Sequence, residues 1–324
     1  MLRMASRAEP RVTGIPMAPF SDPLACGDLI AHRRYVYGKA AAEDGDWAAA
    51  AEMFAQALEQ APDWPPAWFA LGEARQELRD LEGAAAAFRR TLEADPSDAQ
   101  GAAPRLAQLG ETEPAKTLPE AYVARLFDHY APRFEAHLTQ SLAYRGPALI
   151  IEALDVAAPC RRFASALDIG CGTGFMGEVL RARVDRLTGV DLAPAMIARA
   201  RGRGLYDALA ASDATAYLSC SAPRAFDCIV AADALPYFGD LAPLFASCRR
   251  ALTDAGLVAF SIEAFAGEGF RLGPAMRFVH ARDYVETTAA ASRLKPLLVQ
   301  PGWIRREAGV EAPGLICVFE ARDR

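Results

Sequence analysis

The stretch LDIGCGTGFMG, residues 167–177, decides the fold, because an apolar run ends in an aspartate and then continues into closely spaced glycines. Gly170, Gly172 and Gly174 fall at every second position. Glycine-rich turns after strands are typical of nucleotide sites, since the backbone can approach a ligand where no side chain intervenes. The stretch predicts a strand, a nucleotide-binding turn and a helix that begins at Phe175.

The spacing of the glycines separates several kinds of nucleotide site. A dinucleotide turn of the G-x-G-x-x-G type needs its third glycine at position 175, which is a phenylalanine here. A phosphate-binding P-loop is excluded because no Gly-Lys-Ser/Thr follows. Asp168 at the strand end is unfavourable beside a pyrophosphate and favourable beside a cation. The turn therefore favours a positively charged cofactor.

From about residue 120 onward, short apolar runs alternate with helical patterns, which predicts a parallel sheet with helices on both faces. Strands are expected at 165–170, 186–191, 206–212, 226–233 and 256–264, and helices from 175 and 194 and at 214–219 and 241–252. The closing stretch 294–322 has two apolar segments around a polar loop and predicts an antiparallel hairpin. Ligands of such sheets lie at the carboxyl ends of the strands.

The region 31–110 is rich in alanine and has apolar residues at helical spacing. Identical residues 34 positions apart are Gly38 and Gly72, Asp46 and Asp80, Ala50 and Ala84, Phe54 and Phe88, Leu58 and Leu92, and Pro62 and Pro96. This period and these residue types resemble the tetratricopeptide repeat. The resemblance covers two units, 31–64 and 65–98, and a helix near 99–109 is expected to cap them.

These patterns divide the chain into an irregular or disordered segment 1–30, a repeat domain 31–110, a polar linker 111–119 and an α/β domain 120–324. Two interpretations of the repeats stay open. They support the second domain or join subunits, or they present a concave surface to a protein partner. The repeat domain has more acidic than basic residues, so a partner held there is expected to be basic.

The motif Asp168-Ile169-Gly170-Cys171-Gly172-Thr173-Gly174 resembles the first motif of class I S-adenosylmethionine-dependent methyltransferases. With the repeats in front, the whole chain looks like the predicted bacterial tetratricopeptide-repeat methyltransferases. The resemblance implies a Rossmann-like seven-stranded sheet with an antiparallel last strand. It also implies an enzyme that uses S-adenosylmethionine and releases S-adenosylhomocysteine. A site rich in carboxylates suits the positive sulfonium of this cofactor.

The resemblance assigns cofactor-binding residues to successive strand ends. Gly170, Cys171, Gly172 and Gly174 would let the backbone approach the methionine part of the cofactor, with Asp168 beside them. These residues lie at the end of the first strand of the expected sheet.

The next strand ends would bind the nucleoside. Asp191 would accept both ribose hydroxyls, and Leu192 and Met196 would flank the adenine. Asp213 would accept the adenine amino group, with the backbone of Ala214 as its neighbour. Any one of these aspartates alone is also explained as a strand-end or helix-cap residue, and their succession favours the cofactor.

Two further residues complete the expected cofactor site. Asp233 ends the fourth strand, where the sulfonium and the transferred methyl group would lie. Tyr130, in a helical segment before the sheet, would fold over the cofactor. The alternative for this segment is an amphipathic helix that packs on the sheet edge.

The acceptor site has candidates but no signature motif. Arg277, His280 and Tyr284 share a face if their stretch is helical, with His280 and Tyr284 as catalytic candidates and Arg277 for acceptor binding. Alternatively, His280 caps a helix from residue 281. Tyr237 and Glu263 are further acceptor-binding candidates. No metal-ligand cluster is apparent, so no metal is expected.

The bulk properties narrow the function classes. The net charge is −6, so no nucleic-acid partner is expected. No apolar run approaches the roughly 18 residues of a membrane span. The number of cysteines is odd and no C-x-x-C pair occurs, which fits a reducing cytoplasm. We expect methyl transfer to oxygen or nitrogen of a small molecule. The alternatives are a protein methyltransferase whose repeats recruit the substrate, and a cofactor-binding scaffold without turnover.

Overall fold

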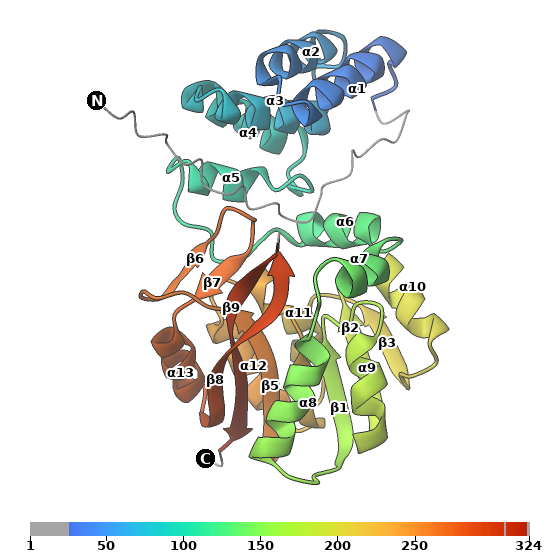
Figure 1. Ribbon diagram of the computed structural model, residues 1–324, viewed down its shortest axis with the longest axis vertical. Coiled ribbons are helices and arrows are strands. Elements are labelled where there is room, and N and C mark those ends of the chain that lie inside the picture. The colour runs from blue at the N-terminus through green and yellow to red at the C-terminus, as the bar shows by residue number, and fades with distance from the viewer. Residues whose placement is uncertain (1–25, 308, 323–324) are drawn as a thin grey trace, which may run out of the picture.

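The computed structural model describes residues 26–307 and 309–322, and Figure 1 shows a helical unit that lies against one end of an α/β unit. Most of the segment 1–30, predicted to be irregular, lies outside the described residues. Its last two residues already belong to the first helix, α1 (Leu29–Glu43). The division into repeats and an α/β unit confirms the predicted fold class.

The helical unit consists of two helix hairpins and a fifth, shorter helix. The helices are α1, α2 (Trp47–Gln60), α3 (Pro65–Glu77), α4 (Leu81–Ala94) and α5 (Ala102–Gln108). The second helix of each hairpin begins in the same way: Asp46 accepts the backbone N–H of Ala49, and Asp80 accepts that of Gly83, both at 3.0 Å. These caps satisfy backbone donors that the helix leaves unpaired.

Each hairpin is held together by a glycine that faces a phenylalanine. A Cβ atom on Gly38 would lie 2.6 Å from the ring of Phe54, and one on Gly72 would lie 2.5 Å from the ring of Phe88. Both rings are buried almost completely. The glycines therefore permit the close approach of the two helices, and the 34-residue period in the sequence is a period of packing contacts.

The short helix α5 covers the open end of the second hairpin, as expected. Ala102 and Leu106 are buried against Phe69 and Phe88. The predicted capping role is confirmed.

The α/β unit is built on one seven-stranded sheet with the order β3-β2-β1-β4-β5-β9-β8. Its strands are β1 (Phe163–Ile169), β2 (Val184–Asp191), β3 (Ala208–Ala211), β4 (Phe226–Ala231), β5 (Leu252–Glu263), β8 (Leu294–Glu307) and β9 (Val310–Ala321). Strands β1 to β5 are parallel where they pair, and β9 runs antiparallel between β5 and β8. The predicted antiparallel final hairpin is confirmed.

Helices cover both faces of the sheet and bury two separate cores. One core contains α8 (Gly146–Ala157) and α9 (Phe175–Leu180). The other contains α11 (Ala214–Cys220), α12 (Ala242–Ala251) and α13 (Arg282–Ala291). The helix α10 (Pro194–Gly202) lies near β2 and β3. This double cover explains the continuous apolar runs of the strands.

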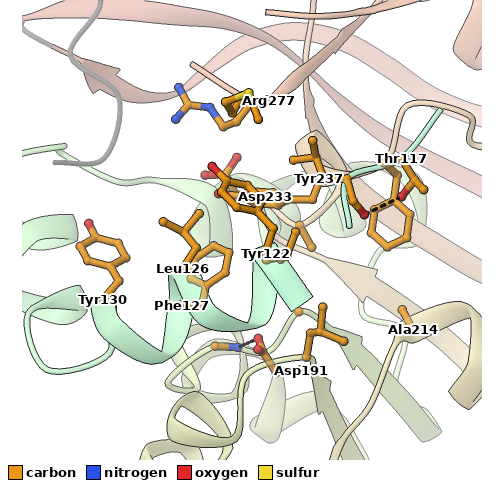
Figure 2. A pocket seen from close by; sticks show the side chains of 18 of the residues that line it. Thr117, Tyr122, Leu126, Phe127, Tyr130, Asp191, Ala214, Asp233, Tyr237 and Arg277 are labelled. Carbon is orange, nitrogen blue, oxygen red and sulfur yellow. Dashed lines mark hydrogen bonds between the residues drawn. The ribbon is translucent and has the colours of Figure 1, made fainter. Parts of the chain in front are cut away.

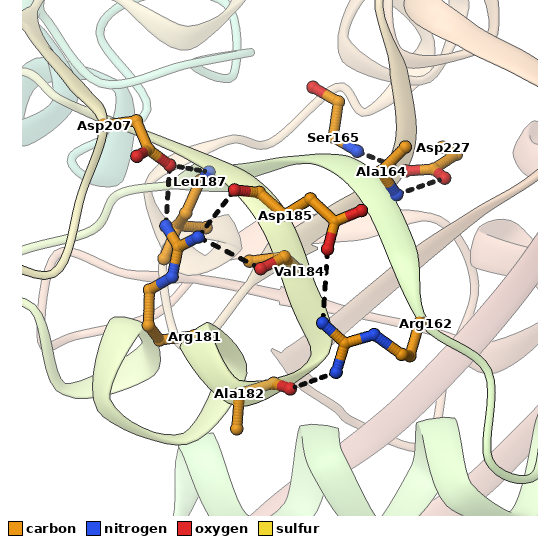
Figure 3. A network of polar contacts seen from close by, with 10 residues as sticks. All are labelled: Arg162, Ala164, Ser165, Arg181, Ala182, Val184, Asp185, Leu187, Asp207 and Asp227. Carbon is orange, nitrogen blue, oxygen red and sulfur yellow. Dashed lines mark hydrogen bonds and ion pairs between the residues drawn. The ribbon is translucent and has the colours of Figure 1, made fainter.

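Charged side chains connect the amino ends of the strands, and the glycine turn lies at the opposite, carboxyl ends (Figure 3). Arg181 donates to Asp207 at 2.6 Å and to the backbone of Asp185 at 2.7 Å. Asp227 accepts the backbone N–H groups of Ala164 and Ser165. Because ligands of parallel sheets lie at the other edge, we interpret this network as structural.

The predicted linker 111–119 is not a free connection at its second end. The carbonyl of Lys116 accepts the backbone N–H groups of Gly239 and Asp240 at 3.0 and 2.8 Å. Leu118 is buried with residues of the following helix, α6 (Glu120–Tyr130). The α/β unit therefore includes residues that the sequence pattern placed in the linker.

The stretch from 277 to 284 is not a continuous helix, so the condition under which Arg277, His280 and Tyr284 would share a helix face is not met. β6 (Phe270–Leu272) pairs with β7 (Phe278–His280), and α13 begins only at Arg282. The reason is the tight hairpin, which uses residues 278–280 for ladder hydrogen bonds with β6.

Replacement of Gly72 by alanine tests the packing of the repeats. We expect Gly72→Ala to lower the free energy of unfolding by about 1 kcal/mol, because overpacking costs about 1–3 kcal/mol and helix propensity returns up to about 1 kcal/mol. Gly202→Ala is the control, since a Cβ there meets no atom within 4 Å. Equal effects of the two variants in urea titrations would contradict the packing role.

Candidate functional site

A cavity of about 1290 Å³ lies at the carboxyl ends of the first four strands. The helices α6 and α7 (Phe134–Gln140) supply another part of its wall. Figure 2 shows Tyr122, Leu126 and Phe127 on α6, with Asp191 and Arg277 on opposite sides of the view. The volume exceeds that of most sites for one small ligand, which are about 300–1,000 Å³. The cavity therefore has room for two ligands.

The predicted cofactor residues fall into two groups. Those that line the cavity are Tyr130, Gly170, Gly172, Asp191, Leu192, Asp213, Ala214 and Asp233. Those outside its lining are Asp168, Cys171, Gly174 and Met196. The second group corrects the prediction, for reasons that differ between residues.

The glycine turn needs glycine at each of its three positions. Gly170, Gly172 and Gly174 have φ angles of 65°, 53° and 101°, which side chains disfavour. A Cβ on Gly170 would also lie 2.5 Å from that of Ala234. Gly174 faces Arg203 instead of the cavity and starts helix α9. The turn thus presents bare backbone to the cavity at Gly170 and Gly172.

Asp191 joins the turn to the end of β2. Its carboxylate accepts the backbone N–H of Gly172 and that of Ala193, both at 2.9 Å. Burial raises the pKa of Asp191, and the two backbone donors oppose this shift. The carboxylate therefore holds the turn in shape and also lines the cavity.

The residues expected around the adenine differ in their surroundings. Asp213 caps α11 by accepting the N–H of Ala216 at 2.7 Å, and it still lines the cavity with Leu192 and Ala214. Met196 is fully buried in the cluster around Ala193 and cannot reach a ligand in the cavity. Its predicted contact with adenine is therefore wrong, because α10 turns this side chain toward the protein interior.

Asp168 lies beneath the turn. One carboxylate oxygen accepts the hydroxyl of Tyr206 at 2.6 Å, and the same hydroxyl accepts the N–H of Gly177 at 3.1 Å. Asp168 is completely buried, and burial raises its pKa to about 7. Cys171 is also buried beside it, which raises the pKa of the thiol. Asp168 therefore anchors the turn through Tyr206 and does not reach into the cavity.

The part of the cavity next to Arg277 and Arg305 holds a buried charge network that the sequence only partly indicated. Arg305 donates to both Asp233 and Glu263. Arg277 donates to Glu263 through its Nε at 2.6 Å. Asp233 has a φ angle of 64° and a pKa raised by burial, against which Arg305 acts. Arg277, Arg305 and Asp233 line the cavity. Glu263, predicted for acceptor binding, is not among the lining residues, because its carboxylate pairs with both arginines.

Arg305 was missed in the sequence because it lies in β8, far from every recognised motif. The same strand also carries Lys295, Arg306 and Glu307, so the charge of Arg305 did not stand out in the sequence. The strand brings it to the carboxyl end of β4 only because β9 inserts between β5 and β8. No local pattern encodes that arrangement.

Aromatic side chains from α6 and α7 form the wall that faces the strand ends. Phe127 contacts Tyr237 edge to face, with ring centroids 5.2 Å apart. Tyr130 contacts Phe134 in the same way at 5.2 Å. The hydroxyl of Tyr130 is hydrogen-bonded to Nδ1 of His137, a residue that the sequence did not single out. Tyr237, predicted for acceptor binding, also lines this cavity.

The two predicted catalytic residues, His280 and Tyr284, do not line the cavity. His280 is fully buried in β7, its Nε2 bonds to the carbonyl of Gly239 at 2.9 Å, and burial lowers its pKa to about 4. Tyr284 donates to Asp240 and accepts the N–H of Leu241. Neither reaches a ligand, so both catalytic interpretations are corrected. The cap alternative for His280 is also wrong, since the cap residue is Ala281 and has no side-chain cap bond.

The repeat unit contributes to the cavity wall. Glu73 on α3 and Arg105 on α5 form an ion pair of 3.1 Å, and both line the cavity. The contact between units includes Gln108, which donates to the carbonyl of Gly273 at 2.8 Å. A Cβ on Gly101 would touch the ring of Tyr122 at 2.9 Å. The repeats are therefore part of the structure around the site.

Within residues 26–307 and 309–322, no group of three or more His, Cys, Asp or Glu side chains is arranged to hold a metal ion. Across the same described part of the chain, every helix is too short or too polar to cross a bilayer.

Comparison with known families agrees with the two-unit architecture. Residues 167–260 match the family described as "Methyltransferase domain", and residues 41–118 match "Tetratricopeptide repeat". The first match spans the strands and helices that carry most of the cofactor candidates. The second extends beyond the predicted repeat domain into the segment that contacts residues 237–240.

Curated relatives match only part of this chain. A malonyl-[acyl-carrier protein] O-methyltransferase from Enterobacter lignolyticus is 31% identical over 139 residues, which are 43% of this chain and 52% of that protein. A ubiquinone biosynthesis O-methyltransferase from Xylella fastidiosa is 32% identical over 96 residues, which are 29% and 39%. The chain thus spans about half or less of these relatives.

A solved structure shows the same fold at low identity. The [4+2]-cyclase SpnF aligns with a TM-score of 0.53 and 16% identity, over 65% of this chain and 99% of that chain. This likeness concerns the fold alone.

The buried Asp168 predicts a pH-dependent contribution to stability. Its folded pKa of about 7 exceeds the ordinary value near 4, so the folded state retains a proton that the unfolded state has lost. Stability from this group is present at low pH and decreases between about pH 4 and pH 7. We expect Asp168→Asn to remove this decrease.

The measurement is the unfolding temperature at pH 5 and pH 8. Relative to wild type, Asp168→Asn should become more stable by several degrees as the pH rises. Asp185→Asn, at a residue whose side chain is 69% exposed, is the control and should run parallel to wild type. A pH-independent difference for Asp168→Asn would refute a raised pKa.

Proposed function

For a chain that carries a class I methyltransferase domain behind tetratricopeptide repeats, we propose methyl transfer from S-adenosylmethionine to a small-molecule acceptor. The observation that carries this proposal is the cavity, in which bare backbone at the glycine turn and carboxylates at three strand ends face the same space. When bound, the cofactor would supply a methyl group on a positively charged sulfur. The chain itself has to bind the cofactor and the acceptor, orient them toward each other and exclude water.

The residues present fit this cofactor. The turn forms a cradle that a side chain at Gly170 would fill. Asp233 has a buried carboxylate oxygen without a hydrogen-bond partner, at the cavity. An unpaired buried oxygen is costly, and a cationic ligand compensates it. The unpaired carboxylate oxygen suits a ligand with a positive centre more than a phosphate, and the glycine cradle gives that ligand room.

We assign roles by position in the cavity. Asp191 would bind the ribose, Asp213 and Ala214 the adenine, and Gly170 and Gly172 the methionine part. Asp233 would face the sulfonium. Tyr130 would cover the cofactor from α6.

The acceptor would occupy the space near Arg277 and Tyr237, with Glu263 holding Arg277 in place. Two relatives are named O-methyltransferases, which supports oxygen over nitrogen as the methylated atom. The wall of aromatic rings suits an acceptor with an apolar part.

Two alternatives have a specific basis. The repeats match a family of protein-interaction modules, which supports a protein substrate recruited by them. A methyltransferase fold does not by itself establish turnover, so a cofactor-binding scaffold without turnover is the second alternative. Deleting the repeats does not separate these cases, because Glu73 and Arg105 are then lost from the cavity wall.

Calorimetry with S-adenosylmethionine tests the cofactor. We expect wild type to bind and Asp191→Ala to bind roughly 10- to 100-fold more weakly, since it loses a charged hydrogen-bond acceptor worth about 1.5–3 kcal/mol. Asp185→Ala, on the same strand and exposed, is the matched control and should bind as wild type does. Absence of binding by wild type would refute the cofactor assignment.

Point variants separate a small-molecule acceptor from a recruited protein. For a small acceptor, we expect Arg105→Ala to raise the acceptor KM roughly two- to tenfold, because it changes the cavity wall. Tyr37→Ala, at an exposed residue of α1, should leave turnover unchanged. Product S-adenosylhomocysteine is measured with a metabolite extract and with a protein extract.

Turnover that requires the protein extract and decreases with Tyr37→Ala would favour recruitment of a protein substrate. Cofactor binding without product in either extract would favour the scaffold.

A further inference from the structure

The hydrogen bond between Tyr130 and His137 lies in the wall of the cavity. Tyr130 ends α6 and His137 lies within α7, so a short connection holds the two side chains together. The tyrosine hydroxyl bonds to Nδ1 of the imidazole, and the rings meet edge to face with centroids 5.6 Å apart. Tyr130 is 5% exposed, whereas His137 is half-buried. Tyr130 therefore has little contact with solvent outside the cavity, whereas His137 is partly accessible.

The charged groups near this pair connect it to the acceptor end of the cavity. Burial raises the pKa of Tyr130 to about 12, and Arg133 and Arg305 act against this rise. Arg305 comes from β8 and donates to Asp233 at the end of β4. In the segment before α8, the half-buried Tyr144 donates its backbone N–H to the carbonyl of Leu138 on α7. The Tyr130 hydroxyl thus shares its surroundings with the proposed sulfonium position.

We propose that Tyr130 and His137 form a proton relay that deprotonates a hydroxyl group of the acceptor. This inference rests on the proposed function and deepens it. As the acceptor oxygen forms its bond to the methyl carbon, the bond from that carbon to sulfur breaks and its electron pair stays on sulfur. The acceptor O–H proton passes to the Tyr130 oxygen, and the Tyr130 proton passes to Nδ1 of His137. The resulting imidazolium releases its proton to solvent.

The relay identifies the class of acceptor. A carboxylate is ionised at neutral pH and has no proton to lose, so a relay gives no advantage to its methylation. A phenol or enol, with a pKa near 10, reacts faster when its proton is accepted during the transfer. The chemistry at this wall therefore favours a hydroxylated acceptor over a free carboxylate.

Nuclear magnetic resonance of histidine-labelled full-length protein tests the hydrogen bond without any acceptor. The sequence has four histidines, and His137→Asn assigns the signal by its loss. We expect neutral His137 to carry its proton on Nε2 and to accept at Nδ1. Tyr130→Phe should shift this tautomer balance. A proton on Nδ1 of neutral His137 would overturn the relay, because Tyr130 would then accept from the imidazole.

Kinetics test the proton transfer, with the acceptor found in the metabolite extract. Asparagine at position 137 can still accept the Tyr130 hydrogen bond but cannot gain a proton. We expect His137→Asn and Tyr130→Phe each to lower kcat by roughly 100-fold and to flatten its rise with pH. The double variant should lose little more, because the two residues act as one unit. His129→Asn, at an exposed neighbour on α6, is the matched control and should keep the wild-type profile.

S-adenosylhomocysteine binding distinguishes a loss of proton transfer from a loss of cofactor binding. We expect His137→Asn to keep the wild-type Kd, which shows that the loss lies in proton transfer. A wild-type rate and pH profile in His137→Asn, or an acceptor methylated on a carboxylate, would overturn the relay. Absence of turnover by wild type would contradict the proposed function, while the resonance experiment still decides the state of the hydrogen bond.

Discussion

One carboxylate holds the site together. Asp191 accepts backbone N–H groups from Gly172 in the turn after β1 and from Ala193 after β2. The turn can adopt its left-handed angles only because its residues are glycines, and it keeps them because this acceptor and the Tyr206 anchor restrain it from two sides. The shape of the cavity floor therefore depends on bonds between neighbouring strand ends.

The cavity above that floor is assembled from segments far apart in the chain. The helices before the sheet supply aromatic rings, and the final hairpin supplies Arg305. The repeats add Glu73 and Arg105 at the contact between the units. A buried network of two arginines and two carboxylates is stable only as a whole, because each lost partner leaves an uncompensated charge. This part of the cavity is thus rigid, which suits the in-line transfer that we propose.

Local patterns predicted the parts of this protein that repeat or alternate. The 34-residue period located both hairpins, since glycine and phenylalanine must recur wherever two helices pack closely. The glycine turn and the strand-end aspartates located the cavity floor, because carboxyl ends of parallel strands share one edge. Met196 and His280 were misassigned for the opposite reason. The direction of a side chain depends on the packing of its element, which spacing does not encode.

The sequence by itself determined the two-unit architecture, the order of the strands along the chain and the residues of the turn. These follow from short-range periodicity and from the backbone angles that only glycine adopts easily. Tertiary structure alone decided that β9 inserts beside β5 and brings Arg305 to Asp233, and that Tyr130 and His137 meet at the cavity wall. Such contacts join residues through packing, and packing is a property of the whole chain.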